Sequence, residues 1–191
     1  HISSVNTDNY MGALQATSLL IRDKCDILIH INVNVNKSAP AYDRIWAFQA
    51  TCEEYHVPYD IDLSVKGASY HELLDVIREI FNKIESKYPD QKKGIFLAND
   101  TYANMFLNLI FQKYGTFPST YEIVGFDNSP IASEAILPIT TIGQQIDVIA
   151  KTAMDLLVQQ MEEQKKRVPK PLGEPIHKQI TPILIRRNTT E

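Results

Sequence analysis

Polar side chains follow three short apolar runs of this sequence, and together they could bind a small polar ligand. Asn99, Asp127 and Gln144 each come within two residues of the end of such a run, and the runs cover residues 94–98, 121–126 and 139–142. In an open α/β sheet, ligands bind beyond the carboxyl ends of the strands. The three positions therefore predict one shared cleft for a small molecule.

The sequence contains no local motif for catalysis or phosphate binding. The patterns GxSxG, GxxxxGKS/T, GxGxxG and HExxH are absent, and the five histidines are scattered without the short spacing of a metal site. Asp60 and Asp62 share one face of a predicted strand, either as an exposed edge or as ligands for a metal or a sugar. We expect no enzyme activity, no metal and no cofactor.

Composition indicates an ordinary globular protein. Of the 191 residues, 44% are hydrophobic and 22% are charged, with a formal net charge of −4. This balance allows a buried core and offers no basic surface for nucleic acid. Cys25 and Cys52 lack the spacing of a metal site, which favours structural thiols in a reducing cytoplasm. No targeting segment or membrane span is predicted.

Hydrophobic periodicity predicts alternating strands and helices. The expected strands cover residues 2–5, 25–31, 59–65, 94–98, 121–126, 139–142 and 179–185, and the expected helices cover 10–22, 45–52, 73–84, 101–114 and 146–161. A loop is expected over 168–175. Alternation with connections of this length predicts parallel sheets in a doubly wound α/β protein.

Local signals mark two helix ends and one helix face. Ser69 followed by Glu72 is a capping box that predicts a helix start, and Gly115 predicts the end of the helix over 101–114. In the helix over 146–161, apolar residues recur at helical spacing. That pattern predicts a face that packs against a core.

Six segments of the chain, taken in order, resemble the LacI family of bacterial transcription regulators. They are Asp8-Asn-Tyr-Met-Gly12, Asp43-Arg-Ile-Trp-Ala-Phe48, Ala98-Asn-Asp100, Val124-Gly-Phe-Asp-Asn128, Pro138-Ile-Thr-Thr-Ile-Gly-Gln144 and the ending Pro182-Ile-Leu-Ile-Arg-Arg-Asn-Thr-Thr190. The resemblance covers nearly the whole chain. It implies a type I periplasmic-binding-protein-like fold, in which three crossover strands join two Rossmann-like lobes. An effector, usually a sugar or a nucleobase, would lie between the lobes.

The same resemblance implies a division into lobes. Residues 1–36 and 143–167 would form part of a first lobe, and residues 37–142 and 176–191 would form an essentially whole second lobe. The family's DNA-binding headpiece and the early units of the first lobe are missing from this sequence. We therefore expect an N-terminally incomplete chain that does not read operator DNA by itself.

Carried onto this sequence, the family pattern places five residues at the effector: Asp8, Arg44, Asn99, Asp127 and Gln144. Carboxylates accept hydrogen bonds from vicinal hydroxyls, a guanidinium donates in a plane, and amides do both, so the set suits a polyol. Leu63 and Ile146 fall where the family often has an aromatic residue that stacks on the ligand, which favours a sugar over a purine. Trp46 replaces a small residue common in the family.

Each of these site residues has a simpler interpretation. Three of them could only cap the helices that follow: Asp8, Asn99 and Asp127. Arg44 could be a surface residue that pairs with Asp43 or Glu54.

We therefore expect the effector-sensing domain of a LacI-type repressor, which binds a small carbohydrate and controls operator binding allosterically. A homodimer is expected, with operator DNA contacted through the absent headpiece. A solute-binding protein of a sugar transporter shares the fold, and an enzyme on a flavodoxin-like sheet is a third alternative. A partial lobe would expose an apolar face, so we expect either further residues of a longer protein or self-association to cover it.

Overall fold

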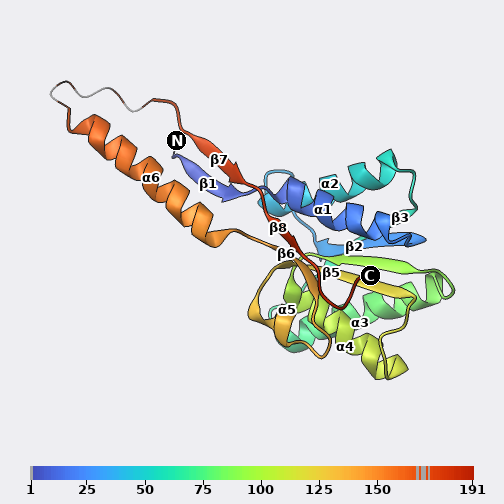
Figure 1. The fold of residues 1–191 in the computed structure, drawn as a ribbon. Coiled ribbons are helices and arrows are strands. Elements are labelled where there is room, and N and C mark those ends of the chain that lie inside the picture. The colour runs from blue at the N-terminus through green and yellow to red at the C-terminus, as the bar shows by residue number, and fades with distance from the viewer. Residues whose placement is uncertain (1, 167, 169–170, 172) are drawn as a thin grey trace.

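The computed structural model describes residues 2–166, 168, 171 and 173–191, and strands alternate with helices along most of the chain (Figure 1). The strands are β1 (Ser4–Thr7), β2 (Ile27–Val33), β3 (Tyr59–Val65), β4 (Lys93–Leu97), β5 (Tyr121–Asp127), β6 (Thr140–Gly143), β7 (His177–Ile180) and β8 (Ile183–Ile185). The helices are α1 (Asn9–Arg22), α2 (Pro40–Glu54), α3 (Tyr70–Lys87), α4 (Asp100–Tyr114), α5 (Pro130–Glu134) and α6 (Ile146–Gln164).

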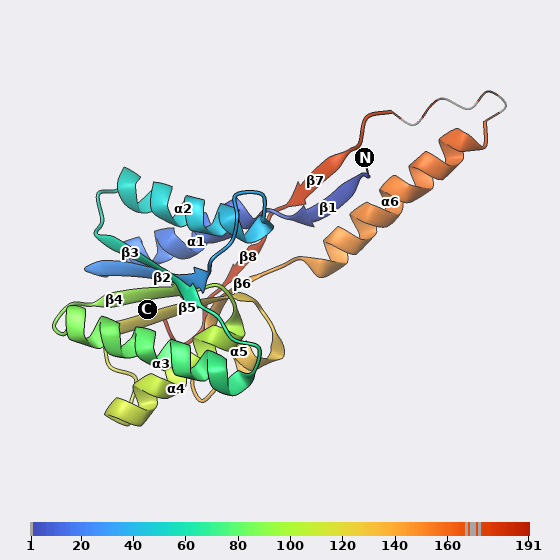
Figure 2. The ribbon, with the colours of Figure 1, turned by 180° about the vertical axis from the view of Figure 1, so that it is seen from behind.

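Six strands form one sheet, which together with α1 to α5 we call the body. The strand order is β3-β2-β4-β5-β6-β8. Neighbouring strands are parallel except for β8, which runs antiparallel to β6. Helices α1 and α2 cover one face of the sheet, and α3, α4 and α5 cover the other (Figures 1 and 2). The predicted α/β class with parallel sheets is confirmed.

An apolar cluster lies on each face of the body sheet, because successive strand residues point to opposite faces. Leu28 and Phe96 pack with the residues of α1 and α2. Ile29 and Ile95, their neighbours in sequence, pack with those of α3 and α4. The strands are therefore buried on both faces, as expected for a parallel sheet.

The strands β1 and β7 form a separate parallel pair, which projects from the body together with α6 (Figures 1 and 2). We call these three elements the arm. Within the described residues of α6, Leu156 alone is buried. The large exposed apolar side chains of this helix are Ile146, Val148, Met154, Leu157, Val158 and Met161. The prediction of a core-facing helix is wrong here, because a two-stranded sheet is too small to cover that face.

Three crossover segments join the arm to the body: residues 7–8, 144–145 and 180–182, where the first and the third are counted from the last residue of β1 and of β7. The expected lobe boundaries at residues 36 and 176 do not match this arrangement. Strand β2 is hydrogen-bonded between β3 and β4, so it belongs to the body, and β7 pairs with β1 in the arm. In this structure, the arm and the body meet near residues 8, 144 and 181. Assigning the body and the arm to second and first lobes is a proposal.

Local signals set several element ends. The Ser69 hydroxyl caps α3 by accepting from the Glu72 N–H at 3.2 Å, and Gly115 ends α4 with φ of 68°. The strand expected over 179–185 is instead two strands, with Pro182, which lacks an N–H, between them. Helix α5 was not expected.

The loop expected over 168–175 lies partly outside the described residues, as does residue 167 of the expected first lobe. In the described ranges, every helix is too short or too polar to cross a lipid bilayer.

Candidate functional site

The carboxyl ends of β4, β5 and β6 lie side by side, and two of the predicted polar residues, Asp127 and Gln144, are in contact there. Asn99 follows β4, Asp127 ends β5 and Gln144 follows β6, and these strands are neighbours in the sheet. In the register of β5 and β6, Asp127 lies opposite Gly143. The sheet topology therefore places Gln144 next to Asp127.

Two short hydrogen bonds connect Asp127 to the arm. The Gln144 Nε2 donates to Asp127 Oδ1 at 2.7 Å, and the Thr7 hydroxyl donates to Gln144 Oε1 at 2.7 Å. Asp127 has φ of 101°, in a region that residues other than glycine rarely adopt. Such strain is concentrated at functional sites. Asp127 is thus held in an unusual conformation with its carboxylate in a polar contact.

Arg44 is fixed on three sides by the body. Its Nε donates to Asn9 Oδ1 at 2.8 Å, and its Nη1 donates to the Ala98 carbonyl at 2.7 Å. The guanidinium carbon lies 3.6 Å from the centre of the Phe126 ring. Burial lowers the pKa of Arg44, and the nearby Asp127 carboxylate opposes that shift. The alternative that Arg44 is a surface residue paired with a neighbouring acid is wrong.

A cleft of about 340 Å³ opens beside Arg44 and Gln144, at the junction of body and arm. Its lining is mostly polar: Asn6, Thr7, Asn9, Lys37, Ser38, Ala39, Pro40, Asp43, Arg44, Gln144 and Gln179. None of these described lining residues is aromatic. The cleft can therefore donate and accept many hydrogen bonds but offers no ring for stacking.

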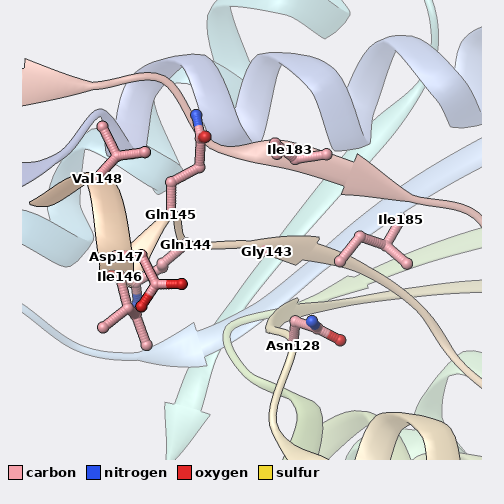
Figure 3. Close-up of a pocket in the computed structure, with 9 residues that line it drawn as sticks. All are labelled: Asn128, Gly143, Gln144, Gln145, Ile146, Asp147, Val148, Ile183 and Ile185. Carbon is pink, nitrogen blue, oxygen red and sulfur yellow. The ribbon is translucent and has the colours of Figure 1, made fainter.

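A second pocket of about 370 Å³ lies against the crossover that leads into α6 (Figure 3). Gln144 lines both this pocket and the cleft, whereas Ile146, which is 68% exposed, lines only the second pocket. Leu63 is half-buried on β3 and lines neither of the two. The structure thus does not bring Leu63 and Ile146 together with Arg44.

Two predicted residues act as helix caps. Asp8 Oδ1 accepts from the Met11 N–H at 3.0 Å at the start of α1, and Asn99 Oδ1 accepts from the Tyr102 N–H at 3.0 Å at the start of α4. These bonds stabilise helix starts. A further role of Asp8 and Asn99 at the effector stays a prediction.

Asn9 and Thr7 were missed by sequence reasoning. Asn9 is the neighbour of the predicted Asp8; its amide oxygen accepts from Arg44, whereas Asp8 caps α1. Asn9 lies in the segment Asp8-Asn-Tyr-Met-Gly12, and the resemblance of that segment to the family could have indicated it as a site residue. Thr7 ends an exposed-looking strand, and nothing in its local sequence marks it.

Asp100 supports the loop that carries Asp127. Its wholly buried carboxylate accepts from the Thr141 hydroxyl at 2.6 Å and from the Ser129 N–H at 2.7 Å. Burial raises the pKa of Asp100, and these donors oppose the shift. A Cβ at Gly125 would collide with the Asp100 carboxylate, so glycine is required there. Asp100 therefore ties the start of α4 to β6 and to the segment after β5.

His30 of β2 lies fully buried beside the rings of Phe48 and Phe96. Its Nδ1 lies 2.8 Å from the Phe96 carbonyl, and its Nε2 lies 3.2 Å from the Asn32 amide nitrogen. Burial lowers the pKa of His30 to about 4, and the Arg44 charge acts in the same direction. The ring is therefore neutral near pH 7, and it donates to the carbonyl and accepts from the amide.

Comparison with known proteins identifies similar chains. Residues 19–190 match the family described as periplasmic binding protein-like domain. The ribose operon repressor of Halalkalibacterium halodurans is 26% identical over 99% of this chain and 53% of its own length. The sucrose operon repressor of Streptococcus mutans is 26% identical over 86% of this chain and 48% of its own length. The chain thus spans about half the length of the curated relatives it matches.

A solved structure shows the same fold. The LacI family transcriptional regulator from Enterococcus faecium, crystallised with bound ribose, superposes with a TM-score of 0.75 at 20% identity, over 98% of this chain and 65% of that one. The resemblance to LacI-type regulators seen in the sequence is confirmed by these relatives.

Proposed function

The chain belongs to the family of periplasmic binding protein-like domains, and on that premise we propose that it is the effector-sensing part of a LacI-type repressor that responds to a small carbohydrate. The operon repressors for ribose and sucrose among its relatives support this proposal over a transporter's solute-binding protein. The function requires reversible binding and no chemistry on the sugar. Operator DNA, a second copy of the chain and a cytoplasmic location belong to the same proposal.

The polar lining of the cleft is the observation that carries the proposal. Arg44 and Asn9 lie on the body side, and Gln144 connects Asp127 to the arm. Ring hydroxyls of a sugar donate to carboxylates and accept from guanidinium and amide groups. A purine would gain most from aromatic stacking, which this lining does not provide.

The position of the cleft suggests how binding is transmitted. A sugar that contacts body and arm at once binds better to the conformation in which the two are close. It therefore shifts the population toward that conformation, and the movement changes the affinity for operator DNA.

A thermal-shift screen of sugars and sugar derivatives tests the proposal. A ligand at a hundred times its Kd adds about 2.7 kcal/mol to the free energy of unfolding. We expect at least one pentose or hexose derivative to raise the Tm, and purine bases to leave it unchanged. Stabilisation by a purine base and by no sugar would contradict the proposal.

Asp127→Ala sharpens the test at the level of one residue. Loss of charge-assisted hydrogen bonds should weaken sugar affinity by roughly 10- to 100-fold, since each contributes about 1.5–3 kcal/mol. Operator binding without sugar should persist in the protein at its full natural length. Asp75→Ala, which removes an exposed carboxylate on α3, is the matched control. Equal sugar affinity in Asp127→Ala and Asp75→Ala would remove Asp127 from the site.

A further inference from the structure

The side-chain amides of two adjacent glutamines join the three crossover segments. Gln144, in the second crossover, accepts from Thr7 in the first and donates to Asp127. Gln145 Nε2 donates to the Thr181 carbonyl in the third crossover at 2.6 Å. Figure 3 shows the Gln145 amide beside the segment that leads into β8. Neighbouring residues thus bind the second crossover to both of the others.

The first and third crossovers are also connected. The Asp8 N–H donates to the Ile180 carbonyl at 2.9 Å, and Gln15 of α1 donates to the Pro182 carbonyl at 3.1 Å. The three segments therefore form a closed set of links, in which each crossover is bonded to the other two. The backbone makes one of these links, and the two glutamines make the others.

The two glutamines differ in their relation to the cleft. Gln144 lines the cleft and contacts Asp127, so a ligand there would compete with or extend its hydrogen bonds. Gln145 lines the second pocket and not the cleft, and its amide donates to the Thr181 backbone carbonyl. The two side chains thus connect the same crossover to the cleft on one hand and to the Thr181 carbonyl on the other.

We propose that Gln145 is a positioning residue that makes the three crossovers move as one unit, so that events at the cleft reach the arm. The regulatory meaning of this inference rests on the proposed function, whereas the mechanical link does not. Without the Gln145 bond, the second crossover and α6 move independently of β7 and β8.

Distance measurements on the full chain test the mechanical link. Spin labels at Glu134→Cys on α5 and Glu162→Cys on α6 lie on exposed positions of body and arm, and the native Cys25 and Cys52 are buried. We expect a narrow distribution of label distances in the labelled parent and a broader one in Gln145→Leu. Gln145→Arg keeps a donor and should restore the narrow distribution.

Gln49→Leu is the matched control, because Gln49 bonds to Glu53 within α2 and away from the crossovers. Superimposable distributions for the parent and Gln145→Leu would overturn the proposal, as would equal broadening in Gln49→Leu.

The regulatory meaning is tested with the protein at its full natural length. Gln145→Leu should reduce the sugar-induced change in operator affinity by roughly fivefold or more, with a much smaller change in the Kd for the sugar. A full operator response in Gln145→Leu would overturn the inference. If the parent binds no sugar, the proposed function fails, while the label distances still decide the mechanical link.

Discussion

The body and the arm both contain helices with apolar residues at helical spacing, yet these residues have different surroundings. Leu107 on α4 is fully buried between the sheet and the neighbouring helix, whereas Leu157 on α6 is 51% exposed. The body supplies six strands with helices on both faces, and the arm supplies two strands. The spacing of apolar residues therefore predicts that a helix has an apolar face. It does not predict whether this chain supplies the strands and helices that bury that face.

The two sides of the cleft also differ in how well their residues are packed. The body contributes Arg44, Asn9 and Asp43 on well-packed helices, while the arm contributes Thr7 and Gln179 from a two-stranded sheet. The charged half of the cleft is thus rigidly supported. The other half depends on the position of the arm.

The largest expected difference is between matched leucine truncations. Leu107→Ala leaves a cavity in the body and should lower the free energy of unfolding by about 2–5 kcal/mol. Leu157→Ala removes exposed surface and should change it by less than about 0.5 kcal/mol. Urea denaturation followed by circular dichroism measures both values. Equal losses would show that α6 is as well covered as α4.

Acidification should weaken the body through His30. The pKa of His30 is lowered from its usual 6.5 to about 4 in the folded chain. Between these values the unfolded chain takes up a proton that the folded chain excludes. Stability is therefore full above pH 6.5, and it falls by about 3 kcal/mol toward pH 4. His30→Gln should remove this part of the pH dependence in denaturation series. Identical pH profiles for the parent and His30→Gln would contradict it.

A charge on the exposed face of α6 should have the smallest effect on the free energy of unfolding. Its effect should instead be on self-association. Self-association through that apolar face is our prediction for the isolated chain, because exposed contiguous apolar surface favours contact with a second copy. Leu157→Lys should lower the mass seen by light scattering, and Gln159→Lys, on an exposed polar position of the same helix, should not. A monodisperse parent monomer of 21.7 kDa would show that the face needs no cover.

Much of the body could be predicted from the sequence, because its signals are local and agree with one another. The strand predicted over residues 59–65, the helix start predicted at Ser69 and the helix end predicted at Gly115 all match the structure. The lobe boundaries could not be predicted, since strand partners are set by the whole sheet. The buried run of β2 gives no local sign that it lies between β3 and β4.

The candidate site was predictable in position more than in detail. The strand ends pointed to Asp127 and Gln144, which the structure brings within 2.7 Å of each other. Asn9 could not be distinguished from Asp8, because the choice between capping a helix and contacting Arg44 depends on where α2 packs. The hydrogen bond of Gln145 depends on the third crossover, 36 residues later in the chain.

The three-sided support of Arg44 has a consequence for the entropy of binding. A free arginine side chain loses rotamer freedom when a ligand orders it, and that loss weakens binding. Arg44 is already held by Asn9, the Ala98 carbonyl and the Phe126 ring before any ligand arrives. The side chain therefore loses its conformational entropy during folding. Nearly all of the free energy of each contact between a ligand and the guanidinium then contributes to binding. Lysine at this position would retain the charge, but its flexible ammonium could not be held in advance by a ring and two acceptors.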